Sequence, residues 1–397
     1  YIKKNYPKKK IIWGGVHPSL LPKQTLEDPS IDYICQREGE KTIYELVIGK
    51  PLKTIKNLGY KKNNQIILNK IREDFLDLDK EDKLDWDLLN LENYIRDYRI
   101  GGKNGGRSMA ITVGRGCIFN CAFCVNTIMG KRWRKLSAKR VIERIKELKE
   151  KYKISHFNIN DDCFDIDWQR VEEICNGLIR EKLGVTWDVS VRAGKKWTDE
   201  KMELLSKAGC IAVSIGAESG SDRILKKISK GVSTEDIIYM AKQCNKHNIS
   251  LISSWMSGFP TETDEELKQT VNLLRKVTEI CPSCSIHGPQ PLKLYPRSEL
   301  YSEAVKNGFK EPKSLREWAK KSGDGFLHHK YLPWVKNPKK LTSIEFYCMN
   351  ANRFPRNSLQ KFLIYSSRLR IKHGFYFFPF EIALTKWYVT NVINNKK

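Results

Sequence analysis

The chain has 397 residues, 40% of them hydrophobic, and carries a formal net charge of +25. Its length predicts two or three domains. No apolar run approaches the ~20 residues that a helix needs to span a bilayer, and no secretory signal opens the chain, which argues against a membrane-spanning or secreted protein. The eleven cysteines stand at scattered spacings, which favours a reducing cytoplasm over a disulfide scaffold.

The positive charge is uneven, because residues 301–397 hold 19 Lys and Arg residues against 6 Asp and Glu. Such an excess is typical of proteins that bind nucleic acid or anionic membranes. The chain is also rich in Lys, Ile and Asn together, a pattern that a compositionally biased genome produces. A solvated basic face is therefore the favoured interpretation, and a nucleic-acid surface is the minor one.

Residues 1–68 predict part of a doubly wound, Rossmann-like α/β domain. Residues 11–18 predict a buried strand that ends in a glycine turn at Gly14-Gly15, and a second strand is predicted over 31–34. Paired glycines allow a ligand to approach the backbone closely. Short helices are predicted over 19–27 and 43–48. Because the chain begins at Tyr1 in what resembles mid-domain, we expect a missing N-terminal part.

Residues 69–108 predict a linker. Alternating acids and leucines lead into the basic, glycine-rich run of residues 101–107. Glycines at this density are typical of a mobile connection.

From Met109 onward the pattern alternates strand and helix six times. Strands are predicted over residues 109–114, 155–160, 185–191, 210–216, 249–257 and 283–290. Helices are predicted over residues 137–151, 168–182, 198–208, 221–228, 234–247 and 263–279. Parallel strands joined by right-handed crossovers close toward a barrel, whose active sites lie at the C-terminal strand ends.

The first of these strands runs into a loop that contains three cysteines, Cys117, Cys121 and Cys124. Thiolates hold iron–sulfur clusters, usually four to a cubane, so three ligands leave one iron open to a substrate or cofactor. The alternatives are a zinc site or three unrelated thiols. Zinc sites usually come as two separated Cys/His pairs, and no second pair at suitable spacing is evident nearby.

Cys117-x-x-x-Cys121-x-x-Cys124 after a Gly-Arg-Gly turn resembles the signature of radical S-adenosylmethionine (SAM) enzymes. The resemblance implies a [4Fe–4S] cluster on these cysteines, with SAM chelated at the open iron and cleaved to methionine and a 5′-deoxyadenosyl radical. It also implies the family's partial (β/α)6 barrel over residues 109–300.

The predicted strand ends carry the candidate SAM-binding residues. Asp162, next to Asp161, could contact SAM or substrate or act in acid–base catalysis, although Asp is also favoured at any helix N-terminus. Arg192 can hold the SAM carboxylate, with a surface salt bridge as its rival. Gly216 and Glu218 belong to a Gly-x-Glu-Ser-Gly segment that resembles the family's, which implies that Glu218 pairs with the SAM ammonium or ribose.

Because the radical SAM signature lies downstream, residues 1–68 can be compared with the domains that precede radical SAM domains. The segments Gly14-Gly15-Val-His-Pro, Asp32-Tyr-Ile and Arg37-Glu-Gly-Glu resemble the closing half of the cobalamin-binding domain that precedes many radical SAM domains. The resemblance implies that Gly14 and Gly15 lie near the nucleotide tail of cobalamin. The upstream half, which carries the lower axial histidine in relatives, is absent. The rival interpretation is a half-domain that serves only as packing.

Two further features remain. Cys281-Pro-Ser-Cys284 has redox or metal spacing, but two buried structural thiols are the favoured interpretation. Residues 301–397 predict a mainly helical region whose aromatic runs, Phe375–Phe380 and Trp387-Tyr388, could pack on the barrel, line a substrate pocket or rest on a membrane.

The sequence therefore predicts a cytoplasmic radical SAM enzyme of the cobalamin-associated type, similar to the anaerobic magnesium-protoporphyrin IX monomethyl ester cyclases and class B methyltransferases. Its expected cofactors are a [4Fe–4S] cluster, SAM and, if residues 1–68 bind it, cobalamin. Its expected partners are a small or lipid-like substrate and a reductant such as flavodoxin or ferredoxin, with nucleic acid disfavoured and peripheral membrane contact left open. The alternatives are a tRNA methylthiotransferase-like enzyme and a non-catalytic iron–sulfur protein or inactive fragment.

Overall fold

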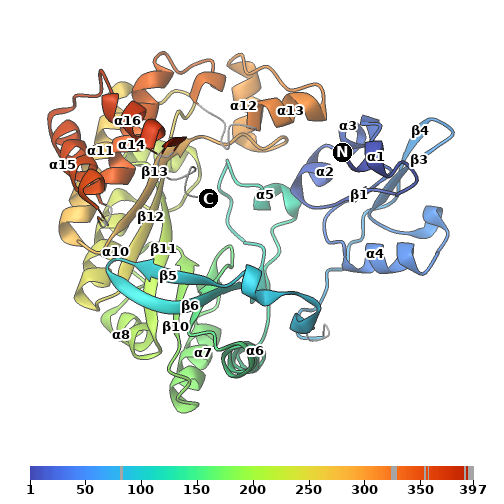
Figure 1. Ribbon diagram of the computed structural model, residues 1–397, viewed down its shortest axis with the longest axis horizontal. Coiled ribbons are helices and arrows are strands. Elements are labelled where there is room, and N and C mark those ends of the chain that lie inside the picture. The colour runs from blue at the N-terminus through green and yellow to red at the C-terminus, as the bar shows by residue number, and fades with distance from the viewer. Residues whose placement is uncertain (81–83, 323–328, 353–354, 356, 389, 392–397) are drawn as a thin grey trace. The chain divides into compact units, whose positions relative to one another are not determined.

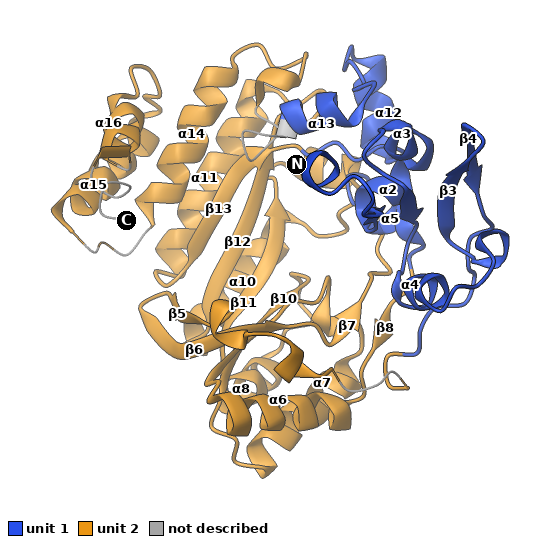
Figure 2. Ribbon diagram, turned by 45° about the vertical axis from the view of Figure 1, so that its right-hand side comes forward, with its two compact units in different colours: residues 1–77, 122–131, 293–327 blue, residues 78–121, 132–292, 328–397 orange. Residues whose placement is uncertain are grey.

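The computed structural model describes residues 1–80, 84–322, 329–352, 355, 357–388 and 390–391. The chain divides into two compact units (Figure 2). Unit 1 comprises residues 1–77, 122–131 and 293–327, and unit 2 comprises residues 78–121, 132–292 and 328–397.

Unit 2 is built on a sheet in the order β13-β12-β11-β10-β9-β6-β5. Its strands are β5 (Arg96–Ile100), β6 (Lys103–Ile111), β9 (His156–Ile159), β10 (Thr186–Val191), β11 (Cys210–Glu218), β12 (Ser250–Ser257) and β13 (Ser285–Pro291). All neighbours pair in parallel except β5 and β6, which are antiparallel. The sheet is curled, as Figure 1 shows, and it confirms the predicted α/β half-barrel.

Helices connect the successive parallel strands and cover the outer face of the curled sheet (Figure 1). They are α6 (Ala138–Tyr152), α7 (Trp168–Arg180), α8 (Asp199–Lys207), α9 (Asp222–Lys227), α10 (Thr234–Lys246) and α11 (Asp264–Ile280). On α6 the buried residues Val141, Ile145 and Leu148 recur at helical spacing, so one apolar stripe faces the sheet. Thr263 begins α11 with a capping box to Glu266, as its position in the sequence predicts.

The predicted linker is wrong for residues 96–108, because they form the β5–β6 hairpin. Gly101 and Gly102 have φ of +55° and +83°, the left-handed pair that a two-residue hairpin turn requires. A Cβ at Gly105 would lie 2.8 Å from the His156 ring, so this glycine permits close packing of β6 on β9. The glycines thus serve a tight turn and a close approach.

Unit 1 contains a small sheet in the order β1-β2-β3-β4. β1 (Ile12–Trp13) and β2 (Tyr33–Cys35) pair in parallel, as predicted, while β3 (Leu58–Lys62) and β4 (Gln65–Leu68) form an antiparallel hairpin. Leu26, Ile34 and Leu58 are fully buried in its core. Its helices are α1 (Ile2–Asn5), α2 (Val16–Leu20), α3 (Pro22–Glu27), α4 (Glu40–Val47), α5 (Asn126–Met129), α12 (Glu299–Lys306) and α13 (Leu315–Ser322).

The helical C-terminal region is confirmed. In unit 2 it forms α14 (Pro338–Ala351), α15 (Ser358–His373) and α16 (Phe380–Tyr388), with α14 packed on β13 and α15. Across the described residues, no helix is long and apolar enough to cross a bilayer.

Candidate active site

The cysteine loop leaves β6 through the short ladder of β7 (Gly114–Arg115) with β8 (Arg134–Lys135). Cys117 and Cys121 belong to unit 2, and Cys124 belongs to unit 1, just before α5. Among the described residues, no three His, Cys, Asp or Glu side chains gather in a group that could hold a metal ion. The three cysteines lie on one loop, and their role as metal ligands stays a prediction.

The acidic pair after β9 holds the backbone of this loop. The Asp161 Oδ1 atom accepts hydrogen bonds from the backbone N–H groups of Val113 (2.8 Å) and Gly114 (2.7 Å). Burial raises the pKa of Asp161 to about 6. The exposed Asp162 accepts from the backbone N–H of Gly116 at 2.9 Å. Both carboxylates therefore position the start of the cysteine loop, and contact of Asp162 with SAM or substrate stays a prediction.

Gly116 is the residue on which this loop path depends. Its φ is +83°, and a Cβ there would lie 2.0 Å from the carbonyl oxygen of Arg132, which precedes β8. An L side chain would therefore meet both backbone strain and a backbone clash.

We expect Gly116→Ala to displace the loop and to lower the iron bound per chain after reconstitution, at a cost of about 1–3 kcal/mol in folding stability. Gly184→Ala is the matched control, because Gly184 also has a positive φ (+58°) but no heavy atom lies within 4 Å of its Cβ position. Iron analysis with thermal melting measures both quantities. Full iron loading of Gly116→Ala would contradict the role given to this glycine.

Cys163, which the sequence did not single out, lies against the first cysteine of the motif. A hydrogen bond with Cys163 lowers the pKa of Cys117 to about 6. The same contact, together with burial, raises the pKa of the Cys163 thiol. The thiolate is the form that binds iron, so this contact favours the ligand form of Cys117. The signal in the sequence was the position of Cys163, directly after the acidic pair.

Arg192, at the end of β10, lies over the cysteine loop. Its guanidinium carbon is 3.9 Å from the centre of the Phe119 ring, a cation–π contact with the residue between the first two cysteines. Its backbone N–H donates to the Asp165 carboxylate at 3.1 Å, and that carboxylate pairs with Lys196 at 2.5 Å. The structure thus brings Arg192 to the motif, as predicted from the strand end.

Glu218 ends β11 in a buried ion pair. Its Oε1 atom lies 2.7 Å from the Lys230 ammonium, and the two side chains are 9% and 12% exposed. A Cβ at Gly216 would lie 2.2 Å from Glu218 Oε1 and 2.5 Å from Lys230 Nζ, so Gly216 makes room for the pair. The pairing with Lys230 was missed from the sequence, although Lys230 stands in the segment that resembles the family's. Contact of Gly216 or Glu218 with SAM stays a prediction.

A second buried carboxyl lies after β12, in unit 2. Glu262 accepts a 2.6 Å hydrogen bond from the backbone N–H of Gly258, and burial raises its pKa to about 7. The folded state therefore binds this proton more tightly than the unfolded state, whose pKa is 4.5. The contribution of the protonated Glu262 to the free energy of unfolding is fully present below pH 4.5 and is lost as the pH rises to about 7.

In the parent protein, ionisation of Glu262 is expected to lower the free energy of unfolding by about 3 kcal/mol between pH 5 and pH 8. We expect Glu262→Gln to lack this decrease, because the amide cannot ionise. The amide oxygen can still accept from Gly258. Denaturant unfolding of the variant and the parent at the two pH values measures this difference. Parallel pH profiles would contradict the buried, proton-binding state of Glu262.

Gly14 and Gly15 form an open turn in unit 1. Gly15 has a φ of +92°, and no heavy atom of the described residues lies within 4 Å of its Cβ position. A Cβ at Gly14 would lie 3.8 Å from that of Cys35. His17 stacks on Trp13 with ring centres 5.3 Å apart. The turn leaves space for a ligand, but its approach to cobalamin stays a prediction.

The sequence was compared with models of known protein families. Residues 111–274, which span β6 to α11 with the cysteine loop and the strand-end residues, match the family model of the radical SAM superfamily. The chain carries a radical SAM domain. The half-barrel and the cysteine loop after its first strand are therefore those of the radical SAM domain.

Two relatives are similar beyond the radical SAM domain. An uncharacterised methyltransferase of Pyrococcus horikoshii is 31% identical over 303 residues, which cover 75% of this chain and 63% of the relative. The anaerobic magnesium-protoporphyrin IX monomethyl ester cyclase of a Synechocystis strain is 26% identical, over 69% of this chain and 55% of the enzyme. The chain thus spans less than two thirds of either relative.

A solved structure of the cobalamin-dependent SAM radical enzyme OxsB resembles the fold with a TM-score of 0.66 at 18% identity. The likeness covers 98% of this chain and 63% of that protein, so it includes the small sheet of unit 1 as well as the radical SAM domain.

Proposed function

We propose that this protein is a radical SAM enzyme that cleaves SAM reductively to start radical chemistry on a small-molecule substrate. The observation that carries the proposal is the Cys117-x-x-x-Cys121-x-x-Cys124 loop at the mouth of a half-barrel that matches the radical SAM superfamily. A [4Fe–4S] cluster on this loop supplies the single electron for the cleavage of SAM.

The residues of unit 2 fit the cluster in their chemistry. The donors are thiols, and the contact with Cys163 lowers the pKa of Cys117, which favours the thiolate form that binds iron. Asp161 and Asp162 fix the loop backbone through three hydrogen bonds. We assign Cys117, Cys121 and Cys124 as the ligands of the cluster, because their spacing on one loop is that of the radical SAM signature.

The chain's own residues position SAM and exclude water. Arg192, over Phe119, is placed to attract the SAM carboxylate, and Glu218 to accept from its ammonium or ribose hydroxyls. Phe119, whose ring lies against Arg192, adds an apolar side chain to the cysteine loop and would help to keep water from the site of electron transfer. Because Lys230 already neutralises Glu218, SAM binding at Glu218 requires the ammonium group to share or displace this pair.

Unit 1 supports a cobalamin-dependent reaction. The likeness to OxsB includes this unit, and the Gly14-Gly15 turn offers open space for a ligand. Two classes of reaction follow from the relatives: methyl transfer to an unactivated carbon, and ring-forming oxidation. The reaction requires a reductant of the flavodoxin or ferredoxin type and a reducing compartment such as the cytoplasm.

Anaerobic reconstitution with iron and sulfide, followed by SAM and dithionite, tests the proposal by chromatography of 5′-deoxyadenosine. Production with and without methylcobalamin supports the radical SAM reaction and makes unit 1 incidental. Turnover only with methylcobalamin, or a shifted corrin spectrum on binding, assigns unit 1 a cofactor role. An intact cluster that yields no 5′-deoxyadenosine in either condition would overturn the proposal in favour of a non-catalytic iron–sulfur protein.

A further inference from the structure

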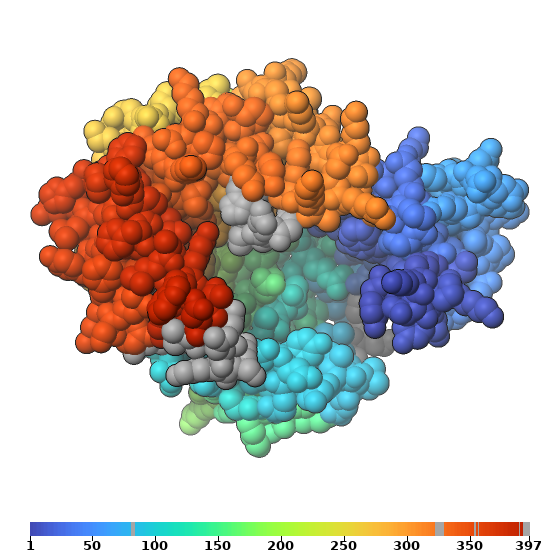
Figure 3. All heavy atoms as spheres, turned by 45° about the horizontal axis from the view of Figure 1, so that its top comes forward, coloured from blue at the N-terminus to red at the C-terminus, as the bar shows by residue number. Residues whose placement is uncertain are grey.

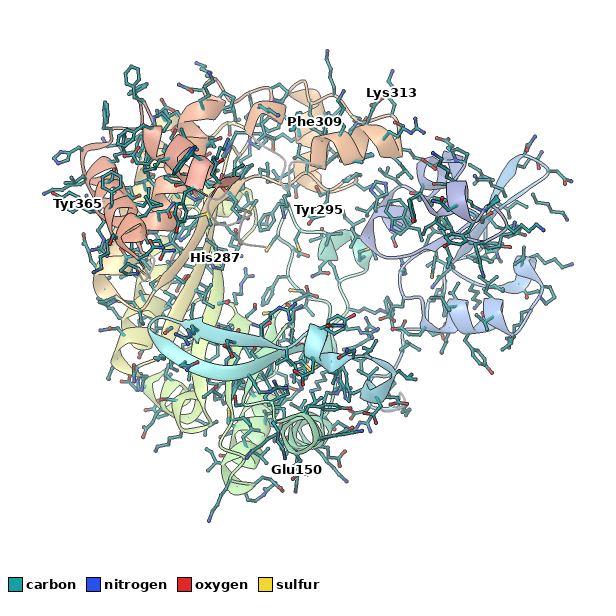
Figure 4. The ribbon with its side chains drawn as sticks, viewed as in Figure 1. Glu150, His287, Tyr295, Phe309, Lys313 and Tyr365 are labelled. Atoms are coloured by element: carbon teal, nitrogen blue, oxygen red, sulfur yellow. The ribbon has the colours of Figure 1, made fainter. Side chains whose placement is uncertain are left out.

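The C-terminal helices of unit 2 present an exposed aromatic face that the radical SAM domain does not use. On α15 it comprises Phe362, Tyr365 and Leu369, spaced at three and four residues on one side of the helix. The loop after α15 and helix α16 add Phe375, Phe377, Phe378, Phe380 and Trp387. Figure 3 shows the red helices at the surface of unit 2, and Figure 4 labels Tyr365, which is 65% exposed.

The buried Arg370 side chain holds the loop after α15 in the conformation that exposes these rings. The Arg370 guanidinium donates to the carbonyl oxygens of Phe377 (2.8 Å) and Phe378 (3.1 Å) and pairs with Glu381 at 2.7 Å. Phe378 is held at a φ of +50°, which is uncommon for a bulky residue, and its side chain is 84% exposed. Arg370 therefore fixes the loop backbone while the phenylalanine rings point to solvent.

A groove lies beside this loop. It has a volume of about 740 Å³ and is lined by the loop aromatics and by α14 and α16, with lysines at its rim. Phe377, Phe378, Pro379 and Ile382 supply its apolar surface. The ring centre of Phe362 on α15 lies 6.4 Å from that of Phe380 on α16, and within the loop Phe375 lies 6.3 Å from Phe377. The face is thus continuous and apolar.

Within α14, α15, α16 and their connections the exposed charges are of one sign, while Asp264 and Glu265 of the neighbouring α11 lie near Lys340 and Lys372. In the described parts of α14, α15, α16 and their connections, the two carboxylates are Glu345 and Glu381. Glu381 is fully buried against Arg370, Ser366 and Tyr347, and burial raises the pKa of Glu345 to about 7. The exposed charges are cationic: Lys339, Lys361, Arg368, Lys372 and Lys386.

We infer that the aromatic face docks on the surface of an anionic lipid bilayer. Phenylalanine and tryptophan with flanking lysines are the composition that inserts into the headgroup region, where each basic residue is attracted by anionic lipid. The groove between Phe378 and α14 is of a size to receive an acyl chain. A nucleic-acid surface is disfavoured, because the rings pack on one another instead of standing apart as separate platforms for bases. The inference does not depend on the proposed reaction, since it concerns binding to lipid.

Cosedimentation of the full chain with phosphatidylcholine vesicles, with and without 30% phosphatidylglycerol, tests the inference. We expect at least about tenfold stronger partitioning onto the anionic vesicles and a loss of most of it at high salt. Phe377→Ser with Phe378→Ser should weaken partitioning by at least about tenfold, because two exposed apolar side chains are removed. Lys372→Gln with Lys386→Gln should weaken it on anionic vesicles only.

Tyr94→Ser is the matched control, because Tyr94 is 61% exposed and lies outside the aromatic face. It should leave partitioning unchanged. Equal binding to neutral and anionic vesicles, full binding by the phenylalanine double variant, or release of the protein from vesicles by competing RNA would each overturn the inference. A parent protein that is dimeric in solution and a phenylalanine double variant that is monomeric would also overturn the inference, because a second copy of the chain would then cover the aromatic face.

Discussion

Alanine at Cys117, Cys121 or Cys124 is expected to abolish both iron–sulfur binding and 5′-deoxyadenosine formation. Each substitution removes one of three thiolate ligands, and two ligands do not hold a cubane with an open iron. Iron and sulfide analysis measures the loss of the cluster, and chromatography after addition of SAM and dithionite measures the loss of turnover.

Cys284→Ala is the control for this experiment. Burial raises the pKa of the Cys284 thiol to about 12, so Cys284 stays protonated and is a poor ligand. The variant should keep its cluster and its turnover. Retained 5′-deoxyadenosine production by any of the three motif variants would contradict the ligand assignment, and loss of the cluster in Cys284→Ala would show that cluster loss does not report on the motif ligands alone.

Lys230→Met is expected to lower the free energy of unfolding by about 3–5 kcal/mol, because it leaves the buried Glu218 carboxylate without its cation. Glu218→Gln combined with Lys230→Met should recover much of this loss, because no uncompensated charge remains. Denaturant unfolding of the two single variants and the double variant gives the coupling between the side chains.

The same variants separate the two roles of Glu218. If Glu218 also contacts SAM, Glu218→Gln should reduce the free energy of SAM binding by more than it reduces the free energy of unfolding. Lys230→Met should not show this larger effect on SAM binding. Additive losses of stability in the double variant would contradict the buried ion pair. Unchanged SAM affinity in Glu218→Gln would limit Glu218 to a structural role.

The six parallel strands were predictable from the sequence because their short apolar runs alternate with amphipathic helices. Of the four residues whose positions predict helix caps, Ser137, Ser221 and Thr263 accept hydrogen bonds from the first turn. Thr198 precedes α8 but makes no such bond. Local composition carries this information. The glycine run of residues 101–107 led to the wrong prediction of a mobile linker. Composition does not distinguish a mobile segment from a hairpin that packs closely against a neighbouring strand.

The residues of the candidate site were predictable from their strand ends, but their partners were not. The sequence identifies Asp162, Arg192 and Glu218 as polar residues at the barrel mouth. It does not show that Asp162 binds the Gly116 backbone or that Glu218 pairs with Lys230. These contacts depend on side-chain directions and on residues distant along the chain. Cys163 was missed for the same reason, since its effect on Cys117 requires their proximity in space.

The central claim is that a cluster on Cys117, Cys121 and Cys124 has an open iron that binds SAM. Electron paramagnetic resonance of the dithionite-reduced, reconstituted protein tests it most directly. The account predicts a [4Fe–4S]⁺ signal whose shape changes when SAM is added, and no signal in the three cysteine variants. A [4Fe–4S]⁺ signal that SAM leaves unchanged would contradict it.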